Sequence, residues 1–186
     1  MAPNDSVDEA LLALFRHNGI TFESAEDAWQ RAEPLFPLLG WLAARFPEDD
    51  AFEVCLEWLR LCAMEVPGAS EVPDLFAQAR GGGPRQGHIS AGALGDLVNR
   101  NILDKKPAVA AFADAAAQLC EVWAAVKTGE MDEETDPWRR AQAASQAMVS
   151  SWLMARDLDD ENREERARAR SGLVRLLRTA RGSIAS

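Results

Sequence analysis

The chain has 186 residues, 47% of them hydrophobic, and a formal net charge of −10 at pH 7. This length is enough for one good hydrophobic core, and the lack of segments that alternate polar and apolar residues argues against a β-sheet protein. A strongly acidic surface repels phosphate backbones, so nucleic acid is an unfavoured partner. We therefore expect one all-α domain over residues 1–186, a single helical bundle of about seven helices.

The cellular location is predicted from the N-terminus and the cysteines. The N-terminal segment is acidic and lacks the basic region of a signal peptide, and no apolar run approaches the ~20 residues needed to span a bilayer. Cys55 and Cys62 share one predicted helix at a separation of about 10.5 Å, which is too long for a disulfide. We therefore expect buried and reduced thiols, a cytoplasmic protein and no membrane partner.

Two capping signals mark the first helices. Ser6 and Glu9 have the spacing of a capping box, which predicts that the first helix begins at Ser6, and Gly19 is placed to end it. Ser24 gives the same type of start signal for a second, short helix. A strongly apolar third helix is then expected over residues 35–46.

The helix predicted over residues 49–66 is the one around which we expect the bundle to assemble. Its apolar side chains recur at three- and four-residue steps, as on one face of an α-helix. They are Phe52, Cys55, Leu56, Leu59, Cys62, Ala63 and Val66. The open edge of this helix is formed by Glu53, Glu57, Arg60 and Met64. Neighbouring helices must therefore cover most of the remaining surface.

Residues 67–90 are predicted to connect two helical parts of the chain. They contain the segments VPGASEVP and GGGPRQGH, with one short turn of helix at residues 74–80. A glycine-rich loop beside His88 also suggests a phosphate-binding loop, but no Gly-Lys-Ser/Thr follows it and no strand precedes it. The preferred interpretation is a flexible connector.

The second half of the chain is predicted to form four helices. They cover residues 90–103, 107–129, 136–155 and 161–181. Gly129 is placed to end the second of them, whose many alanines permit close contact with neighbouring helices. Asp136 followed by Pro137 marks the start of the third.

An internal similarity suggests a duplication. Two pairs of segments match: DAWQRA at 27–32 with DPWRRA at 136–141, and WLAAR at 41–45 with WLMAR at 152–156. If the similarity is a true repeat, residues 6–66 and 107–181 form two related three-helix units, with residues 67–106 inserted between them. Chance similarity among helices rich in Ala, Arg and Leu is the alternative. Equivalent positions for Trp29 and Trp138 would distinguish the two.

The residues that usually carry catalysis are sparse. The chain has two histidines, His17 and His88, and no tyrosine. Neither histidine belongs to an HExxH or a Glu-x-x-His motif, the cysteines lack the spacing of zinc ligands, and no Gly-x-Ser-x-Gly is present. We therefore predict no catalytic residue, no metal ligand and no cofactor.

Acidic clusters support the alternative hypothesis of a magnesium-dependent hydrolase that acts on nucleotides or diphosphates. The segment DDAFE at 49–53 has the spacing of the magnesium-binding motif of isoprenoid enzymes, which are all-helical but far longer. Two Glu-x-x-Glu pairs, at 130–133 and 161–164, resemble the paired acidic motif of all-α nucleotide pyrophosphohydrolases. The first pair lies in a predicted loop, and the second ends in Glu instead of Asp. The segment at 132–136 begins like a calcium loop, but Pro137 stands where glycine is required. Helix-start chemistry is the preferred explanation of each cluster.

The C-terminal helix has the most unusual predicted surface. Its second half presents a core face made of Leu173, Val174, Leu176, Leu177 and Ala180. On a helical wheel, Arg163, Arg166 and Arg170 continue that face into the first half. Arginine binds carboxylate and phosphate bidentately, so these three residues are the predicted partner-binding site. The alternatives are an internal contact with the acidic body of the protein and a contact with nucleic acid.

The sequence favours a non-catalytic protein–protein interaction module over an enzyme. The motifs of catalysis are missing, and residues 162–186 hold seven arginines against two acids in an otherwise acidic chain. An adaptor, an inhibitor of a basic partner, or a small subunit of a larger assembly fits this pattern, with another protein or a second copy of the chain as the partner. A nucleic-acid-associated protein that uses the arginine helix is the further alternative.

Replacing residues on opposite faces of the 49–66 helix tests its predicted orientation. Leu56→Ala is expected to lower the free energy of unfolding by about 2–5 kcal/mol, because removal of a buried leucine leaves a cavity. Glu57→Ala, on the open edge, is expected to change it by less than about 0.5 kcal/mol. Urea titration of both variants measures the difference, and equal losses would show that the helix faces the other way.

Overall fold

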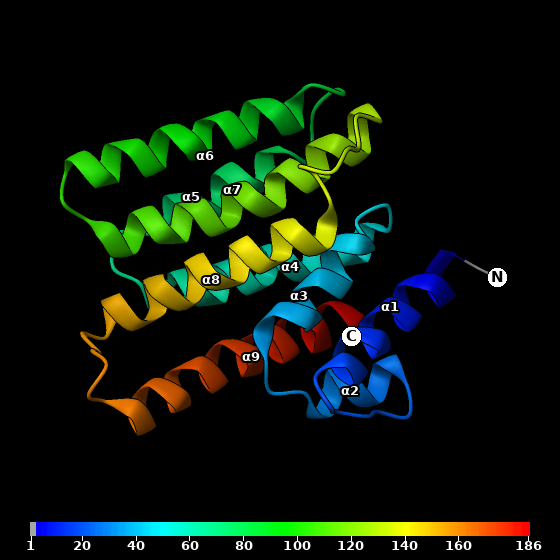
Figure 1. The fold of residues 1–186 in the computed structure, drawn as a ribbon. Helices are drawn as coiled ribbons and strands as arrows, with labels where there is room; N and C mark the ends of the chain where they lie inside the picture. Colours follow the sequence, from blue (N-terminus) through cyan, green and yellow to red (C-terminus); the bar gives the residue numbers. More distant parts are fainter. Residues whose placement is uncertain (1–2) are drawn as a thin grey trace.

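The computed structural model describes residues 3–186, and this part of the chain is all-helical (Figure 1), which confirms the predicted fold class. Nine helices lie in these residues, where we expected about seven. They are α1 (Pro3–His17), α2 (Ala25–Arg31), α3 (Leu35–Ala44), α4 (Asp49–Ala63), α5 (Glu71–Gln78), α6 (Gln86–Leu103), α7 (Pro107–Thr128), α8 (Pro137–Ala155) and α9 (Arg163–Ala185). The two shortest, α2 and α5, have 7 and 8 residues.

The long helices of the second half lie side by side. Figure 1 shows α6, α7, α8 and α9 in that order, and each is in contact with the next. Helix α4 packs against α9, and α3 packs against α8. Helices α1 and α2 lie at one end of the molecule, where α2 meets the C-terminal part of α9. Buried side chains from every helix join in one hydrophobic cluster.

Helix α7 corrects one expectation. By length and composition alone, Pro107–Thr128 is apolar enough to cross a membrane, whereas we expected no apolar run of that length. In the fold, 67% of its most apolar window is buried. A core helix passes the same test as a membrane span, and α7 is packed between α6 and α8.

Helix α4 has the orientation that its pattern predicts. Leu56 is fully buried, and Trp58 Nε1 donates a hydrogen bond of 3.2 Å to the carbonyl oxygen of Leu173 in α9. Met64, on the open edge, is 84% exposed. The helix ends at Ala63, somewhat before its expected end.

Most of the predicted capping residues take the expected role. The Ser24 side chain accepts a backbone N–H at the start of α2, and the Asp136 carboxylate accepts two at the start of α8. Gly129 ends α7 with a φ of 73°, in the left-handed region that glycine tolerates. The capping box predicted at Ser6 is wrong, because α1 already begins at Pro3.

The segment predicted as a connector is largely helical. Helix α5 and the first turn of α6 occupy much of residues 67–90, with a glycine-rich loop between them. Phe76 of α5 is fully buried and stacks on Phe52 of α4, with ring centroids 4.6 Å apart. The apolar face of α5 therefore belongs to the core. This packing holds the segment in place, although its Gly and Pro content suggests a loop.

The proposed internal repeat is not confirmed. Trp29 and Trp41 lie on separate helices, α2 and α3, because the chain is interrupted at Pro34. Trp138 and Trp152 lie on the single helix α8. The first tryptophans of the two segments thus occupy different positions in their units.

Helices α3 and α8 approach each other closely at Gly40. A β-carbon on Gly40 would lie 2.7 Å from Cζ3 of Trp138, closer than non-bonded carbon atoms approach. The indole of Trp138 is therefore seated on the backbone of α3, where any side chain would displace it. This contact places the first turn of α8 against the N-terminal half of the bundle.

Replacing Gly40 with alanine is expected to destabilise the fold, although alanine normally favours a helix. The added methyl group must displace Trp138, and overpacking of this kind costs about 1–3 kcal/mol. Gly92→Ala is the matched control, because no neighbouring group lies within 4 Å of its added β-carbon. That change should stabilise α6 by roughly 0.5–1 kcal/mol. The melting temperatures of the two variants should shift in opposite directions. A gain in stability for Gly40→Ala would contradict the described packing.

Candidate functional site

The predicted binding residues Arg163, Arg166 and Arg170 do not behave as one set. Arg166 Nη1 donates a hydrogen bond of 3.3 Å to the carbonyl oxygen of Leu158 and lies 3.3 Å from Asp160 Oδ1. Arg163 and Arg170 are exposed, and within the described part of the chain no ion pair involves either of them. Arg166 thus holds the turn between α8 and α9, while the other two remain available to a partner.

Two further arginines fix the C-terminal half of α9. Arg178 donates to the carbonyl oxygen of Trp29, at 2.6 Å, and to that of Ala32, both at the end of α2. Arg181 pairs with Glu26 at 2.9 Å, and its guanidinium lies 4.7 Å from the centroid of the Trp29 ring. These two side chains serve the contact between α2 and α9.

Three of the acidic residues that suggest a magnesium site have partners within the fold. Glu53 of α4 pairs with Arg80, which lies just after the end of α5. Hydrogen bonds from the backbone and the side chain of Thr135 lower the pKa of Asp132, because they favour its charged form. Asp136 caps α8. Each of these carboxylates therefore has a local structural role.

The two Glu-x-x-Glu pairs lie at opposite ends of α8. The first pair precedes this helix and the second follows it, so its 19 residues, about 28 Å at ~1.5 Å per residue, separate them. Within the described residues, no group of three or more His, Cys, Asp or Glu side chains is arranged to hold a metal ion. The carboxylates do not converge as a paired acidic motif requires.

The glycine-rich loop at 81–85 borders an open hollow beside His88. His88 Nε2 lies 3.3 Å from Glu130 Oε2, and Arg85 and Lys127 line the same surface. The two buried polar atoms that lack a hydrogen-bond partner in the described residues both lie elsewhere. Nothing in this hollow therefore demands a ligand.

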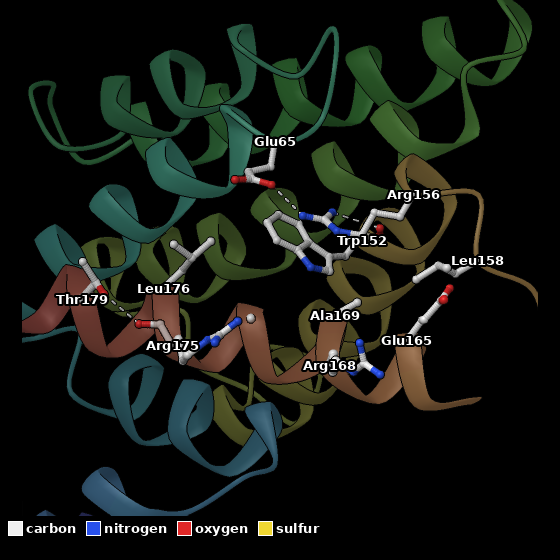
Figure 2. A pocket seen from close by; sticks show the side chains of 11 residues that line it. Glu65, Trp152, Arg156, Leu158, Glu165, Arg168, Ala169, Arg175, Leu176 and Thr179 are labelled. Atoms are coloured by element: carbon white, nitrogen blue, oxygen red, sulfur yellow. Dashed lines mark hydrogen bonds and ion pairs between the residues drawn. The ribbon is translucent and has the colours of Figure 1, made fainter. Parts of the chain in front are cut away.

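A groove of about 470 Å³ lies between α9 and the end of α8. The charged residues that line it are Glu65, Arg156, Glu165, Arg168 and Arg175. Figure 2 shows these side chains around the indole of Trp152. Its volume lies within the range of roughly 300–1,000 Å³ that is usual for ligand sites. We name this surface the α9 groove.

The end of α8 is built by stacking of an arginine on a tryptophan. Arg156 Cζ lies 3.7 Å from the centroid of the Trp152 ring, and Arg156 Nη2 lies 2.7 Å from Glu65 Oε2. Helix α3 ends in the same way, with Arg45 Cζ 4.0 Å from the centroid of the Trp41 ring. The WLAAR and WLMAR segments therefore share a local structure in which the arginine folds back over the residue one turn earlier.

Within the described residues, the indole N–H of Trp152 stands out because it has no acceptor. Trp152 is 3% exposed, and its buried Nε1 has no hydrogen-bond partner in the described part of the chain. The indole N–H groups of Trp41, Trp58 and Trp123 donate to Asp8 or to backbone carbonyl oxygens, at 2.7, 3.2 and 3.1 Å. Buried donors nearly always have a partner, because an unpaired one costs about 1–3 kcal/mol.

Two arginines of α9 face the same groove. Arg168 lies 3.5 Å from Glu164, one helical turn earlier, but the side chains are 76% and 91% exposed. Such an exposed pair contributes little to stability. Arg175 is exposed, and no ion pair involves it within the part of the chain that the structure describes. Arg175 therefore offers the α9 groove hydrogen-bond donors that no ion pair occupies in the described residues.

The residues of the α9 groove carry only a weak signal in the sequence. In the structure Trp152 is buried and Arg168 lies in a local ion pair, both of which are ordinary features of a helical bundle. The sequence patterns do not indicate that Trp152 lies against α9 next to Gly172. Gly172 itself is the sequence signal, since a glycine inside a helix is unfavourable relative to alanine.

Comparison with known proteins adds no functional assignment. No protein-family model matches the chain, and neither a curated protein nor a solved structure does. The function is therefore inferred from the chemistry of α9 and of its groove.

The three cysteines are poorly suited to act as nucleophiles. Cys55, Cys62 and Cys120 are free and buried, as predicted. Burial raises the pKa of all three thiols, that of Cys120 to about 12, because a buried thiolate loses its hydration. The reactive thiolate form is therefore scarce at neutral pH.

The raised pKa values of the three thiols predict that the protein loses stability at high pH. Thiols in the unfolded chain ionise near about pH 8.5, whereas the folded ones stay protonated. The contribution of the protonated thiols to the free energy of unfolding is therefore complete below about pH 8.5, and it is lost as the pH rises toward the folded pKa. The free energy of unfolding should fall by at most about 1.4 kcal/mol per pH unit for each thiol. Urea titrations from about pH 8 to 11 measure this slope, and Cys120→Ala should reduce it. The chain has no tyrosine to titrate in this window, so an unchanged slope in Cys120→Ala would contradict the shift.

Proposed function

We propose that this protein is a non-catalytic protein-binding module that takes an acidic segment of a partner protein along α9. The observation that carries the proposal is that Arg163, Arg170 and Arg175 are exposed without an acid of their own in the described part of the chain. The chain has 30 acidic residues against 20 basic ones, so arginines without a partner are unexpected in it. Guanidinium groups in this state are suited to bidentate contacts with carboxylates from outside.

The charge distribution favours a short acidic segment over nucleic acid. Helix α9 carries seven arginines and two glutamates, whereas the rest of the chain has an excess of acid. A long polyanion that extends beyond α9 meets the acidic body and is repelled. A short acidic segment is attracted to α9 and avoids that repulsion.

The surroundings of α9 support binding in preference to a reaction. Glu53 and Asp136 have structural partners, and the buried thiols stay protonated. Free, buried cysteines are also typical of a reducing compartment, so a cytoplasmic location is part of the proposal. An adaptor or a small subunit of an assembly would use α9 in this way.

Reversing the charge of the three exposed α9 arginines is expected to weaken binding of an acidic peptide. The probe is a fluorescently labelled hexaglutamate peptide, titrated with the full chain and followed by anisotropy. Replacing Arg163, Arg170 and Arg175 together by Glu should lower the affinity by about tenfold or more, since each exposed ion pair contributes roughly 0.2–1 kcal/mol and repulsion replaces it. Added salt should also weaken binding, because the Debye length falls from ~10 Å at 0.1 M to ~3 Å at 1 M.

A matched control separates the site from the overall charge. Arg85, Arg100 and Arg139 are exposed and lie outside α9, and their joint replacement by Glu changes the net charge by the same amount. Hexaglutamate should bind this control much more tightly than it binds the α9 variant. Equal weakening in both variants would contradict the proposal. Tighter binding of an oligothymidine than of hexaglutamate would favour the nucleic-acid alternative.

A further inference from the structure

Two hydrogen-bond donors lie beside the backbone of Gly172, and one of them, the indole N–H of Trp152, has no acceptor in the described part of the chain. The point that a β-carbon of Gly172 would occupy lies 3.8 Å from Trp152 Nε1 and 3.7 Å from Arg175 Nη2. Figure 2 shows the Trp152 and Arg175 side chains pointing toward each other across the α9 groove. An indole N–H and a guanidinium cannot satisfy each other, because neither has an acceptor. An acceptor atom placed between them would satisfy both.

Gly172 leaves room for such an atom. Any other residue at this position would put a carbon atom within 4 Å of both donors. Glycine in the interior of a helix is unfavourable relative to alanine, and α9 nevertheless has glycine here. Nε1 of Trp152 is covered in this structure, so a ligand reaches it only after a neighbouring side chain moves, and the exposed Arg175 lies beside it.

The charges of the α9 groove match a single carboxylate. Arg156 is already engaged by Glu65, at 2.7 Å. Arg168 pairs with Glu164, at 3.5 Å, so Arg175 is the lining arginine without an ion pair in the described part of the chain. A carboxylate oxygen accepts hydrogen bonds from several donors, and such charge-assisted bonds are about twice as strong as neutral ones.

We infer that the point beside Gly172 is a carboxylate-binding site, which holds an aspartate or glutamate side chain of the partner between the indole N–H of Trp152 and the guanidinium of Arg175. The inference rests on the proposed function, because the partner is the acidic segment bound along α9. It adds a defined anchor to a contact that otherwise depends on exposed charges. The same site takes a free carboxylate, which allows the two proposals to be tested separately.

Nuclear magnetic resonance of the indole N–H groups tests the site in the isotope-labelled full chain. The chain has 6 tryptophans, and the Trp152 signal is the one that disappears in Trp152→Phe, a change that keeps an aromatic face for Arg156. Acetate and hexaglutamate are titrated separately. Each should shift the Trp152 indole proton downfield, because a new hydrogen bond to oxygen deshields it, and should leave the other tryptophan signals nearly unchanged.

Gly172→Ala is the decisive variant, because it blocks the site without damaging the helix. Its methyl group would make ordinary contacts at 3.7 and 3.8 Å, and the melting temperature should rise by about 1–4 °C. The affinity for hexaglutamate should nevertheless fall about tenfold, the effect of losing one charge-assisted hydrogen bond. Gly182→Ala is the matched control on the same helix, since no neighbouring group lies within 4 Å of its added β-carbon. It should bind hexaglutamate like the unaltered chain.

The outcomes separate the site from the function. If hexaglutamate binds along α9 while the Trp152 signal does not move and Gly172→Ala binds as tightly as Gly182→Ala, the carboxylate site is wrong and the proposed function stands. If acetate shifts the Trp152 signal but hexaglutamate does not bind, the site stands and the proposed function fails. Inorganic phosphate is the third probe, and a larger shift of Trp152 with phosphate than with acetate would overturn the assignment to a carboxylate.

Discussion

The contact between α4 and α9 is the constraint on which the outer surface of this protein depends. Leu173 and Leu177 of α9 are fully buried, and Trp58 of α4 donates a hydrogen bond to the Leu173 carbonyl oxygen. A helix turns only one face toward its neighbour, so burial of this stripe directs the opposite side of α9, with Arg168 and Arg175, to solvent. The arginine-rich groove is therefore a consequence of hydrophobic packing elsewhere on the same helix.

Stacking of guanidinium groups on tryptophan rings is the second recurring interaction. Arg45, Arg156 and Arg181 each lie over an indole ring, at 4.0, 3.7 and 4.7 Å from its centroid. Each also pairs with a glutamate. A planar guanidinium suits both contacts at once, because its face meets the ring while its edge meets the carboxylate. The fold thus uses these three arginines internally, whereas Arg163, Arg170 and Arg175 of α9 have neither a ring contact nor an ion pair in the described residues.

The α9 groove is a place where local rules of stability are broken. An unpaired buried N–H at Trp152 costs about 1–3 kcal/mol, and glycine within a helix, as at Gly172, costs roughly 0.5–1 kcal/mol relative to alanine. Conflicts of this kind are expected where a surface serves binding. The second buried atom without a partner in the described residues, Nε of Arg45, lies at a smaller hollow of about 160 Å³. The larger groove combines the conflict with free arginines, which is why it is the stronger candidate.

By itself, the sequence determined the all-α class, most of the helices, the buried face of α4 and caps such as Ser24 and Gly129. These features depend on residues within one or two turns of each other, so periodicity and capping rules describe them. The tertiary structure decided which side of α9 carries the groove and which arginines remain free, for example by engaging Arg166 in the turn before the helix. Such choices depend on contacts like that between Trp58 and Leu173, 115 positions apart. No local pattern encodes them, because they are set by how separate hydrophobic faces fill one common core.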